Sequence, residues 1–213
     1  SIWDLESVNH YKDQTDIFFT CHEFSYNKIA EAYEPYLGLI RQMFHKYCSG
    51  TLEEFMEECD VYKLQRPVFE SYFEKGFCER TEQILIDEVE YEQERMRNSI
   101  VTMLQKLSEI RPVVIVLNRF QLASKSTMQL SNSLLQVKNK NIGIVLGVND
   151  VQSIPEFAHE EWDAICESMD DRNMVYHIGN AGRNMEPDVM DYYSDYESDD
   201  GYRKLNNLVY FLD

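Results

Sequence analysis

Two uninterrupted apolar runs constrain the fold of this chain more than any other feature. Residues Val113–Leu117 and Ile142–Val148 consist only of Val, Ile, Leu and Gly, and polar residues or a proline bound each run. A strand that is apolar on both faces must be covered on both faces, which is typical of the parallel sheets of α/β proteins. Helical patterns alternate with these runs, so βαβ units and a parallel sheet are predicted.

Further elements follow from local patterns. Short runs near 16–21 and 174–178 predict two more strands, which gives a parallel sheet of about four strands flanked by helices. Apolar residues at spacings of three and four predict helices over 35–47, 52–59, 67–75, 80–108, 126–137 and 155–169. Thr51 and Glu54 have the spacing of a capping box at the start of the second helix.

The chain divides into three segments. Residues 1–185 are predicted to form the α/β domain, 186–201 an acidic, tyrosine-rich loop, and 202–213 the start of a C-terminal helix. The helix is expected from the spacing of its apolar residues, and it has no stop signal, so a helical repeat is expected to continue it. Four tyrosines of this region can dock on a partner or pack within the domain: Tyr192, Tyr193, Tyr196 and Tyr202.

The charge excludes some partners. The formal net charge is −18, and clustered Lys and Arg are what binds nucleic acid or an anionic membrane, so neither is an expected partner. No apolar run approaches the roughly 18–20 residues of a membrane-spanning helix, and the first residues have no signal-peptide pattern. Five scattered cysteines without a Cys-x-x-Cys pair are typical of reduced thiols, so a cytoplasmic location is expected.

Cofactor motifs are absent from the sequence. None of the eight glycines begins a Gly-x-x-x-x-Gly-Lys-Ser/Thr motif, and no Gly-x-Gly-x-x-Gly occurs. No histidine or cysteine pair has the spacing of a zinc site, and the acidic segment 195–206 lacks the Gly and Glu of an EF-hand. Cys21 and His22 are neighbours on a predicted strand and face opposite ways, so they are not expected to form a catalytic pair. No cofactor or metal is predicted.

The segment 111–124 reads RPVVIVLNRFQLAS. It resembles the Walker B region of STAND-type, AAA-related signalling ATPases, in which an aliphatic strand ends in an acidic pair and a Gln-Trp-Ala-Asp-like turn follows. The strand 142–148 with the polar Asn149 is similar to the sensor strand of that family, and residues 16–47 are similar to the strand and helix that follow the P-loop helix. Residues 205–208 resemble the opening of a helical-repeat region.

The departures from this family decide what the resemblance implies. Asn118 stands at the position of the Mg²⁺-orienting Asp, and Arg119 stands at the position of the second acidic residue. Leu122 replaces the aromatic residue and Ser124 the final Asp, and the first strand, P-loop and first helix have no counterpart. An amide lacks the charge of a metal ligand, and a cation repels Mg²⁺, so catalytic silence is expected.

The resemblance also implies an arrangement and a role. The strands at 113 and 142 should be central neighbours, the strand at 16 should lie outside the strand at 113, and the place of the missing first strand should fall between 142 and 174. The implied function is that of a non-catalytic regulatory or protein-interaction domain of a bacterial signalling protein. In that family such domains precede helical repeats and an output domain, of which a GGDEF diguanylate cyclase is the expected example.

Two alternatives remain open on the sequence. One is a working ATPase whose P-loop precedes residue 1. The other is a small-molecule-sensing α/β domain with its site where open α/β sheets bind ligands, at the carboxyl ends of the strands. The residues expected there are Asn118, Arg119 and Asn149.

Overall fold

The computed structural model describes most of the predicted α/β domain. The described residues are 16–28, 30–76, 89–137, 139–148, 154–170, 175–178 and 208–212, with only the backbone at 89, 170, 175–178 and 208–212. In chain order, the elements are β1 (Phe18–Glu23), α2 (Glu34–Tyr47), α3 (Leu52–Glu58), α4 (Arg66–Lys75), α5 (Val89–Ile110), β2 (Val113–Asn118), η2 (Phe120–Leu122), α6 (Lys125–Gln136), β3 (Ile142–Val148), η4 (Glu156–Ala158), α7 (His159–Asp170), β4 (Val175–Ile178) and β5 (Leu208–Leu212).

The strands form a parallel sheet, which confirms the predicted α/β class. β2 pairs with β1 on one side and with β3 on the other, and these three strands are the part of the sheet whose side chains are described. The backbones of β5 and β4 extend it in the order β1-β2-β3-β5-β4, again with parallel pairing. The predicted count of about four strands is therefore wrong, although each of the four predicted strands exists.

The strand order agrees with the expected arrangement. β2 and β3 are neighbours and β1 lies outside β2, while β5 occupies the place between β3 and β4. The predicted helix over 202–213 is wrong at its end, because Leu208–Leu212 is a strand, and residues 202–207 lie outside the described residues. Five consecutive apolar residues at its end are also compatible with a buried strand, and a run this short does not distinguish the two by spacing.

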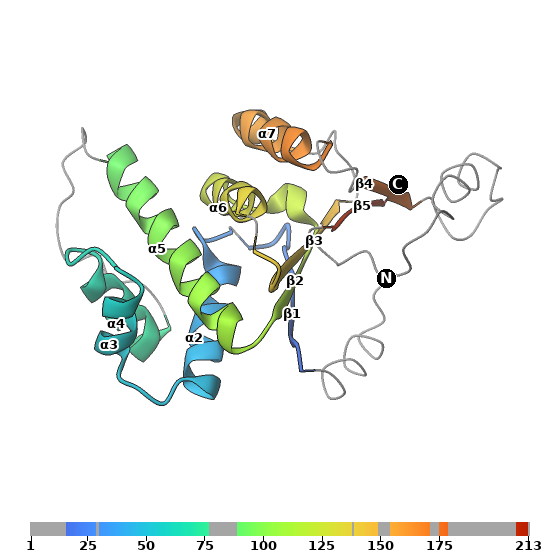
Figure 1. The fold of residues 1–213 in the computed structure, drawn as a ribbon. Coiled ribbons are helices and arrows are strands. Elements are labelled where there is room, and N and C mark those ends of the chain that lie inside the picture. Colours follow the sequence, from blue (N-terminus) through green and yellow to red (C-terminus); the bar gives the residue numbers. More distant parts are fainter. Residues whose placement is uncertain are drawn as a thin grey trace.

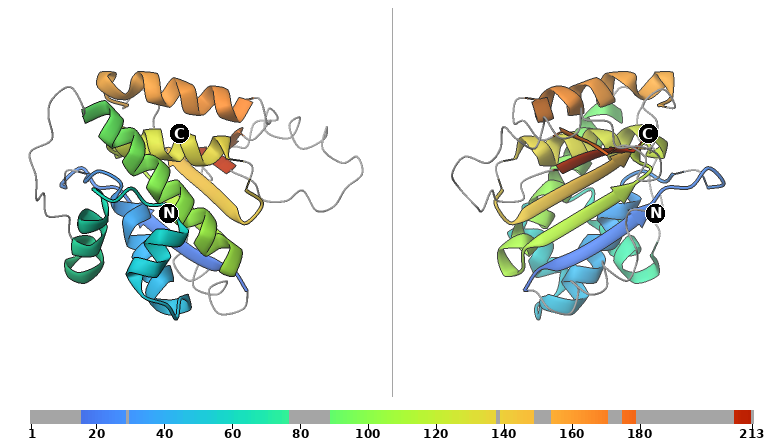
Figure 2. Two further views of the ribbon diagram at one scale, coloured as in Figure 1. Left: turned by 60° about the vertical axis from the view of Figure 1, so that its left-hand side comes forward. Right: turned by 90° about the vertical axis from the view of Figure 1, so that its right-hand side faces the viewer.

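The helices form a layer on one face of the sheet. Figures 1 and 2 show α2, α5, α6 and α7 on the same side of β1, β2 and β3, with α3 and α4 outside α2. The reason is the direction of the connections: β1 to β2, β2 to β3 and β3 to β4 all step the same way across the sheet. Because parallel crossovers are right-handed, steps in one direction place their helices on one face.

The core lies between the sheet and this helix layer. Ile115 and Leu117 of β2 and Ile144 and Leu146 of β3 are all at most 1% exposed and belong to one apolar cluster with the helices. All seven residues of β3 are buried, which confirms the predicted strand buried on both faces. Outside α2, the ring of Phe44 lies 5.1 Å from that of Phe55 and 5.5 Å from that of Phe73, so aromatic contacts attach α3 and α4.

Local signals set the helix boundaries. The Thr51 side chain accepts from the Glu54 backbone and the Glu54 carboxylate accepts from the Thr51 backbone, so the predicted capping box is confirmed. Ser124 caps α6 with its hydroxyl oxygen, which accepts from the Thr127 backbone N–H, and α4 ends at Gly76 in the left-handed conformation. The predicted start of α5 near residue 80 lies outside the described residues. Among the helices of the described ranges, none has the length and hydropathy needed to cross a bilayer.

Candidate functional site

The carboxyl ends of the parallel strands bring the predicted Walker B positions to the edge of the sheet. Asn118 is the last residue of β2, and Glu23, at the end of β1, is its partner in the register. Leu117 pairs with Leu146 on the other side, so Asn118 lies beside Gly147 of β3. This is the edge at which open α/β sheets bind ligands.

Asn118 is fitted closely between its neighbours. Its amide Nδ2 lies 3.8 Å from the Cys21 sulfur, within the range of a weak hydrogen bond. Its Oδ1 lies 3.0 Å from where a Cβ would stand on Gly147, and the Leu117 carbonyl oxygen is 3.7 Å from that point. A side chain at position 147 would thus displace the Asn118 amide. The Asn118 side chain therefore lies close against both β1 and β3.

Arg119 turns away from β3 and towards the outer strand. Its backbone is left-handed, with φ of 55°, and its guanidinium Nη2 lies 3.3 Å from Glu23 Oε1. The two side chains are 39% and 58% exposed, so solvent screens this ion pair and it contributes little to stability. Its consequence is local: a guanidinium, held by a carboxylate of β1, stands at the end of β2.

The turn after β2 is buried. Phe120 and Gln121 of η2 are 0% exposed, and the Phe120 ring lies 6.4 Å from that of Trp162 on α7. Neither side-chain amide atom of Gln121 has a hydrogen-bond partner.

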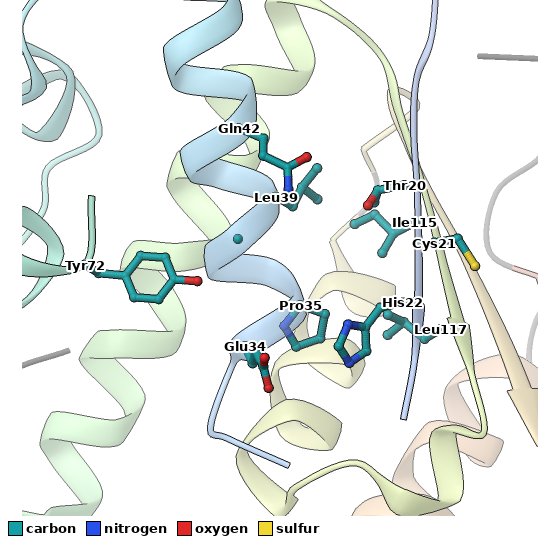
Figure 3. A pocket seen from close by; sticks show the side chains of 11 residues that line it. Thr20, Cys21, His22, Glu34, Pro35, Leu39, Gln42, Tyr72, Ile115 and Leu117 are labelled. Carbon is teal, nitrogen blue, oxygen red and sulfur yellow. The ribbon is translucent and has the colours of Figure 1, made fainter. Parts of the chain in front are cut away.

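A pocket lies beside this edge, between β1 and the start of α2. Its volume is about 220 Å³. Figure 3 shows Thr20 and His22 on the side of β1 that faces α2, whereas Cys21 points away. The predicted separation of Cys21 and His22 is thus confirmed, because neighbours on a strand face opposite ways.

The pocket has an apolar floor and polar walls. Ile115 and Leu117 of β2 form the floor, and Pro35, Gly38 and Leu39 of α2 form one wall. Glu34 and Gln42 at either end of that wall, with Tyr72 of α4, add polar atoms. Neither Asn118 nor Arg119 lines this pocket, so the hollow lies to one side of the ligand site that the sequence predicts.

The electrostatics of the pocket come from three side chains. Burial is the main reason that the pKa of His22 is below its usual value; the Glu34 carboxylate acts in the opposite direction, and Lys28 lowers the pKa further. Lys28 Nζ lies 2.6 Å from Glu34 Oε1, and this bond raises the pKa of Lys28. His22 is accordingly neutral at pH 7, and its ring meets that of Phe24 edge to face at 4.6 Å.

The start of α2 is held in place by α6. The backbone N–H of Tyr33 donates to Thr127 Oγ1 at 3.1 Å, and the Tyr36 hydroxyl lies 2.6 Å from Ser131 Oγ. Tyr36 is 0% exposed, and burial raises the pKa of its hydroxyl. These bonds fix the wall of the pocket to the helix layer.

Some predicted site residues lie outside the described residues: Asn149, Tyr192, Tyr193, Tyr196 and Tyr202. Within the described ranges, no three His, Cys, Asp or Glu side chains gather closely enough to hold a metal ion. Sequence reasoning missed the pocket residues His22, Glu34 and Gly38 as a group. The available signal was Gly38, because a glycine inside a helix lowers stability and points to a local reason.

Comparisons with protein-family models, with curated proteins and with solved structures find no match to this chain.

Proposed function

We propose that this chain is a non-catalytic regulatory or protein-interaction domain of a bacterial signalling protein, with an ATPase-like architecture. The observation that carries the proposal is that β2 ends with Asn118 and Arg119, at the two positions where the resemblance leads us to expect acidic residues. An amide supplies no negative charge to Mg²⁺, and the Arg119 guanidinium, bonded to Glu23, adds a positive one.

The strand order supports the same proposal. In STAND-type ATPases the P-loop strand would lie between the counterparts of β3 and β4, and in this chain β5 lies there. The 213 residues contain no phosphate-binding glycine motif that could act at this place. An output domain, for which the resemblance suggests a GGDEF diguanylate cyclase, would belong to another part of the same protein.

Nucleotide binding tests the proposal directly. Calorimetric titration of the chain with ATP and Mg²⁺ should show no binding, because the sequence has no phosphate-binding glycine motif and an amide and a guanidinium follow the β2 run. The double variant Asn118→Asp with Arg119→Glu should still show no hydrolysis, since these carboxylates act only on a nucleotide held by a P-loop. Circular dichroism of the variant checks that it is folded.

Two results would contradict the proposal. Micromolar affinity for ATP, or turnover by the double variant, would reveal a phosphate site. A P-loop preceding residue 1 in the native chain, together with ATP hydrolysis by that longer chain, would favour the working ATPase instead.

A second candidate function is favoured by the pocket between β1 and α2. A small-molecule-sensing domain needs a hollow with an apolar surface and a few polar groups, and this pocket provides both. Binding of any small probe that shifts the NMR signals of His22 would support this candidate.

A further inference from the structure

We infer that the pocket between β1 and α2 binds a small primary ammonium compound with an apolar body, its ammonium on the Glu34 carboxylate. This inference rests on the second candidate function and names the chemical class of its ligand. Three features support it: the space that Gly38 leaves, the ammonium that Glu34 already holds, and the absence of lysine and arginine from the described residues of the lining.

Gly38 leaves the space open. It lies in the interior of α2, where glycine is unfavourable relative to alanine, and its backbone is not among the described positive-φ glycines. A Cβ at this position would meet only the Tyr72 hydroxyl within 4 Å, at an ordinary contact distance of 3.6 Å. Packing therefore does not demand a glycine here. The missing side chain leaves room at the border of the pocket, on the side where the Tyr72 hydroxyl lies.

Glu34 already holds an ammonium group. Lys28 Nζ lies 2.6 Å from Glu34 Oε1, and the Lys28 side chain is 59% exposed while that of Glu34 is 28% exposed. An exposed lysine held by one ion pair is weakly bound, because side-chain entropy and solvent oppose the contact. A ligand ammonium that also buries an apolar body in the pocket can take the place of Lys28.

The walls suit a cation and not an anion. None of the described residues that line the pocket is a lysine or an arginine, and Glu34 is its one carboxylate. The other polar groups include the Thr20 hydroxyl and the Gln42 amide, which accept hydrogen bonds from an ammonium. The chain as a whole carries a net charge of −18, which attracts cations and repels anions.

The test uses matched probes of one shape. The ammonium probe is phenethylammonium, and 2-phenylethanol and 3-phenylpropanoate are its neutral and anionic counterparts. Each is titrated into the wild-type chain, with binding followed by the NMR signals of the His22 ring. The ammonium should bind most tightly, the alcohol more weakly and the carboxylate least.

Four variants test whether the ammonium binds to the Glu34 carboxylate. Glu34→Gln should weaken ammonium binding about tenfold or more, the effect of losing a charge-assisted hydrogen bond. Glu31→Gln is the matched control, because it removes an exposed carboxylate that acts on Lys28 but does not line the pocket. Lys28→Gln should tighten binding about two- to fivefold by removing the competitor. Gly38→Leu should abolish binding of all three probes by filling the pocket, with the melting temperature showing that the variant is folded.

The outcomes separate this inference from the function on which it rests. If the alcohol or the carboxylate binds as well as the ammonium, the ligand class is wrong and the sensing candidate stands. If Glu34→Gln and Glu31→Gln weaken binding equally, the ammonium is not on Glu34. If no probe binds wild type or Lys28→Gln, both the inference and the sensing candidate fail.

Discussion

Two neighbouring regions at the carboxyl ends of the strands use glycine in opposite ways. Between β2 and β3, a Cβ on Gly147 would lie 3.0 Å from Asn118 Oδ1, which is closer than an ordinary contact. Between β1 and α2, Gly38 has only the Tyr72 hydroxyl near that position, at 3.6 Å, and it borders a pocket of about 220 Å³. Gly147 allows the Asn118 side chain to pack against β3, whereas Gly38 leaves its Cβ position without a close neighbour.

The difference shows where a ligand can enter this fold. At the edge to which the sequence resemblance points, Asn118 contacts Cys21 and Arg119 forms an ion pair with Glu23. The open space lies one strand further out, against α2. The contacts of Asn118 and Arg119 at one position of this edge and the hollow beside it are separate features of the domain.

The largest expected loss of stability comes from shortening a buried side chain at the floor of the pocket. Leu117→Ala removes a 0% exposed side chain that belongs to the core, and it should lower the free energy of unfolding by about 2–5 kcal/mol. Urea unfolding measures this cost. Ile17→Ala, at a 37% exposed position before β1, is the control and should cost far less. A loss below about 1 kcal/mol for Leu117→Ala would show that the floor is not part of the core.

The next largest effect is expected at the close contact between Gly147 and Asn118. Gly147→Ala should lower the free energy of unfolding by about 1–3 kcal/mol, because the added methyl displaces the Asn118 side chain. The same substitution in an Asn118→Ala background should cost much less, since the colliding atom is gone. Urea unfolding of the four chains gives the coupling between the two positions. Additive costs would contradict the close approach.

A substitution at Gly38, beside the pocket, should change the free energy of unfolding in the opposite direction. Gly38→Ala should raise the free energy of unfolding by about 0.5–1 kcal/mol, because alanine favours the helix and meets no close atom. Thermal unfolding detects the rise in melting temperature. A decrease in stability would mean that the pocket wall is packed more tightly than the glycine geometry indicates.

The smallest effect is a pH dependence from His22. Its pKa in the folded chain is below the usual 6.5, mainly because of burial, with Glu34 and Lys28 as the charged groups that act on it. The unfolded chain therefore takes up the proton first as the pH falls through 6.5, and stability is lost on the acid side. Urea unfolding at about pH 7.5 and about pH 5.5 should show a smaller acid-side loss in His22→Gln than in wild type. Equal losses would exclude His22 as a cause.

Much of the fold could be predicted from the sequence because the signals were local. The apolar runs of β2 and β3, the capping box of Thr51 and the apolar spacing of α2 each act within a few residues, and each prediction is confirmed. The segment ending at Leu212 could not be assigned in this way. Its five apolar residues fit a helix face or a buried strand, and its pairing with β3 and β4 made it a strand.

For the candidate site too, some features follow from the local sequence and others only from the tertiary structure. The sequence by itself determined that an amide and a guanidinium follow the β2 run, because chain order places Asn118 and Arg119 at the end of a strand. Only the tertiary structure decided which groups they meet: Glu23 and Cys21 come from β1 and Gly147 from β3, brought alongside by the parallel register. The pocket likewise joins residues far apart in the chain, from Thr20 to Leu117. Contacts between distant segments depend on strand pairing and helix packing, which local patterns do not encode.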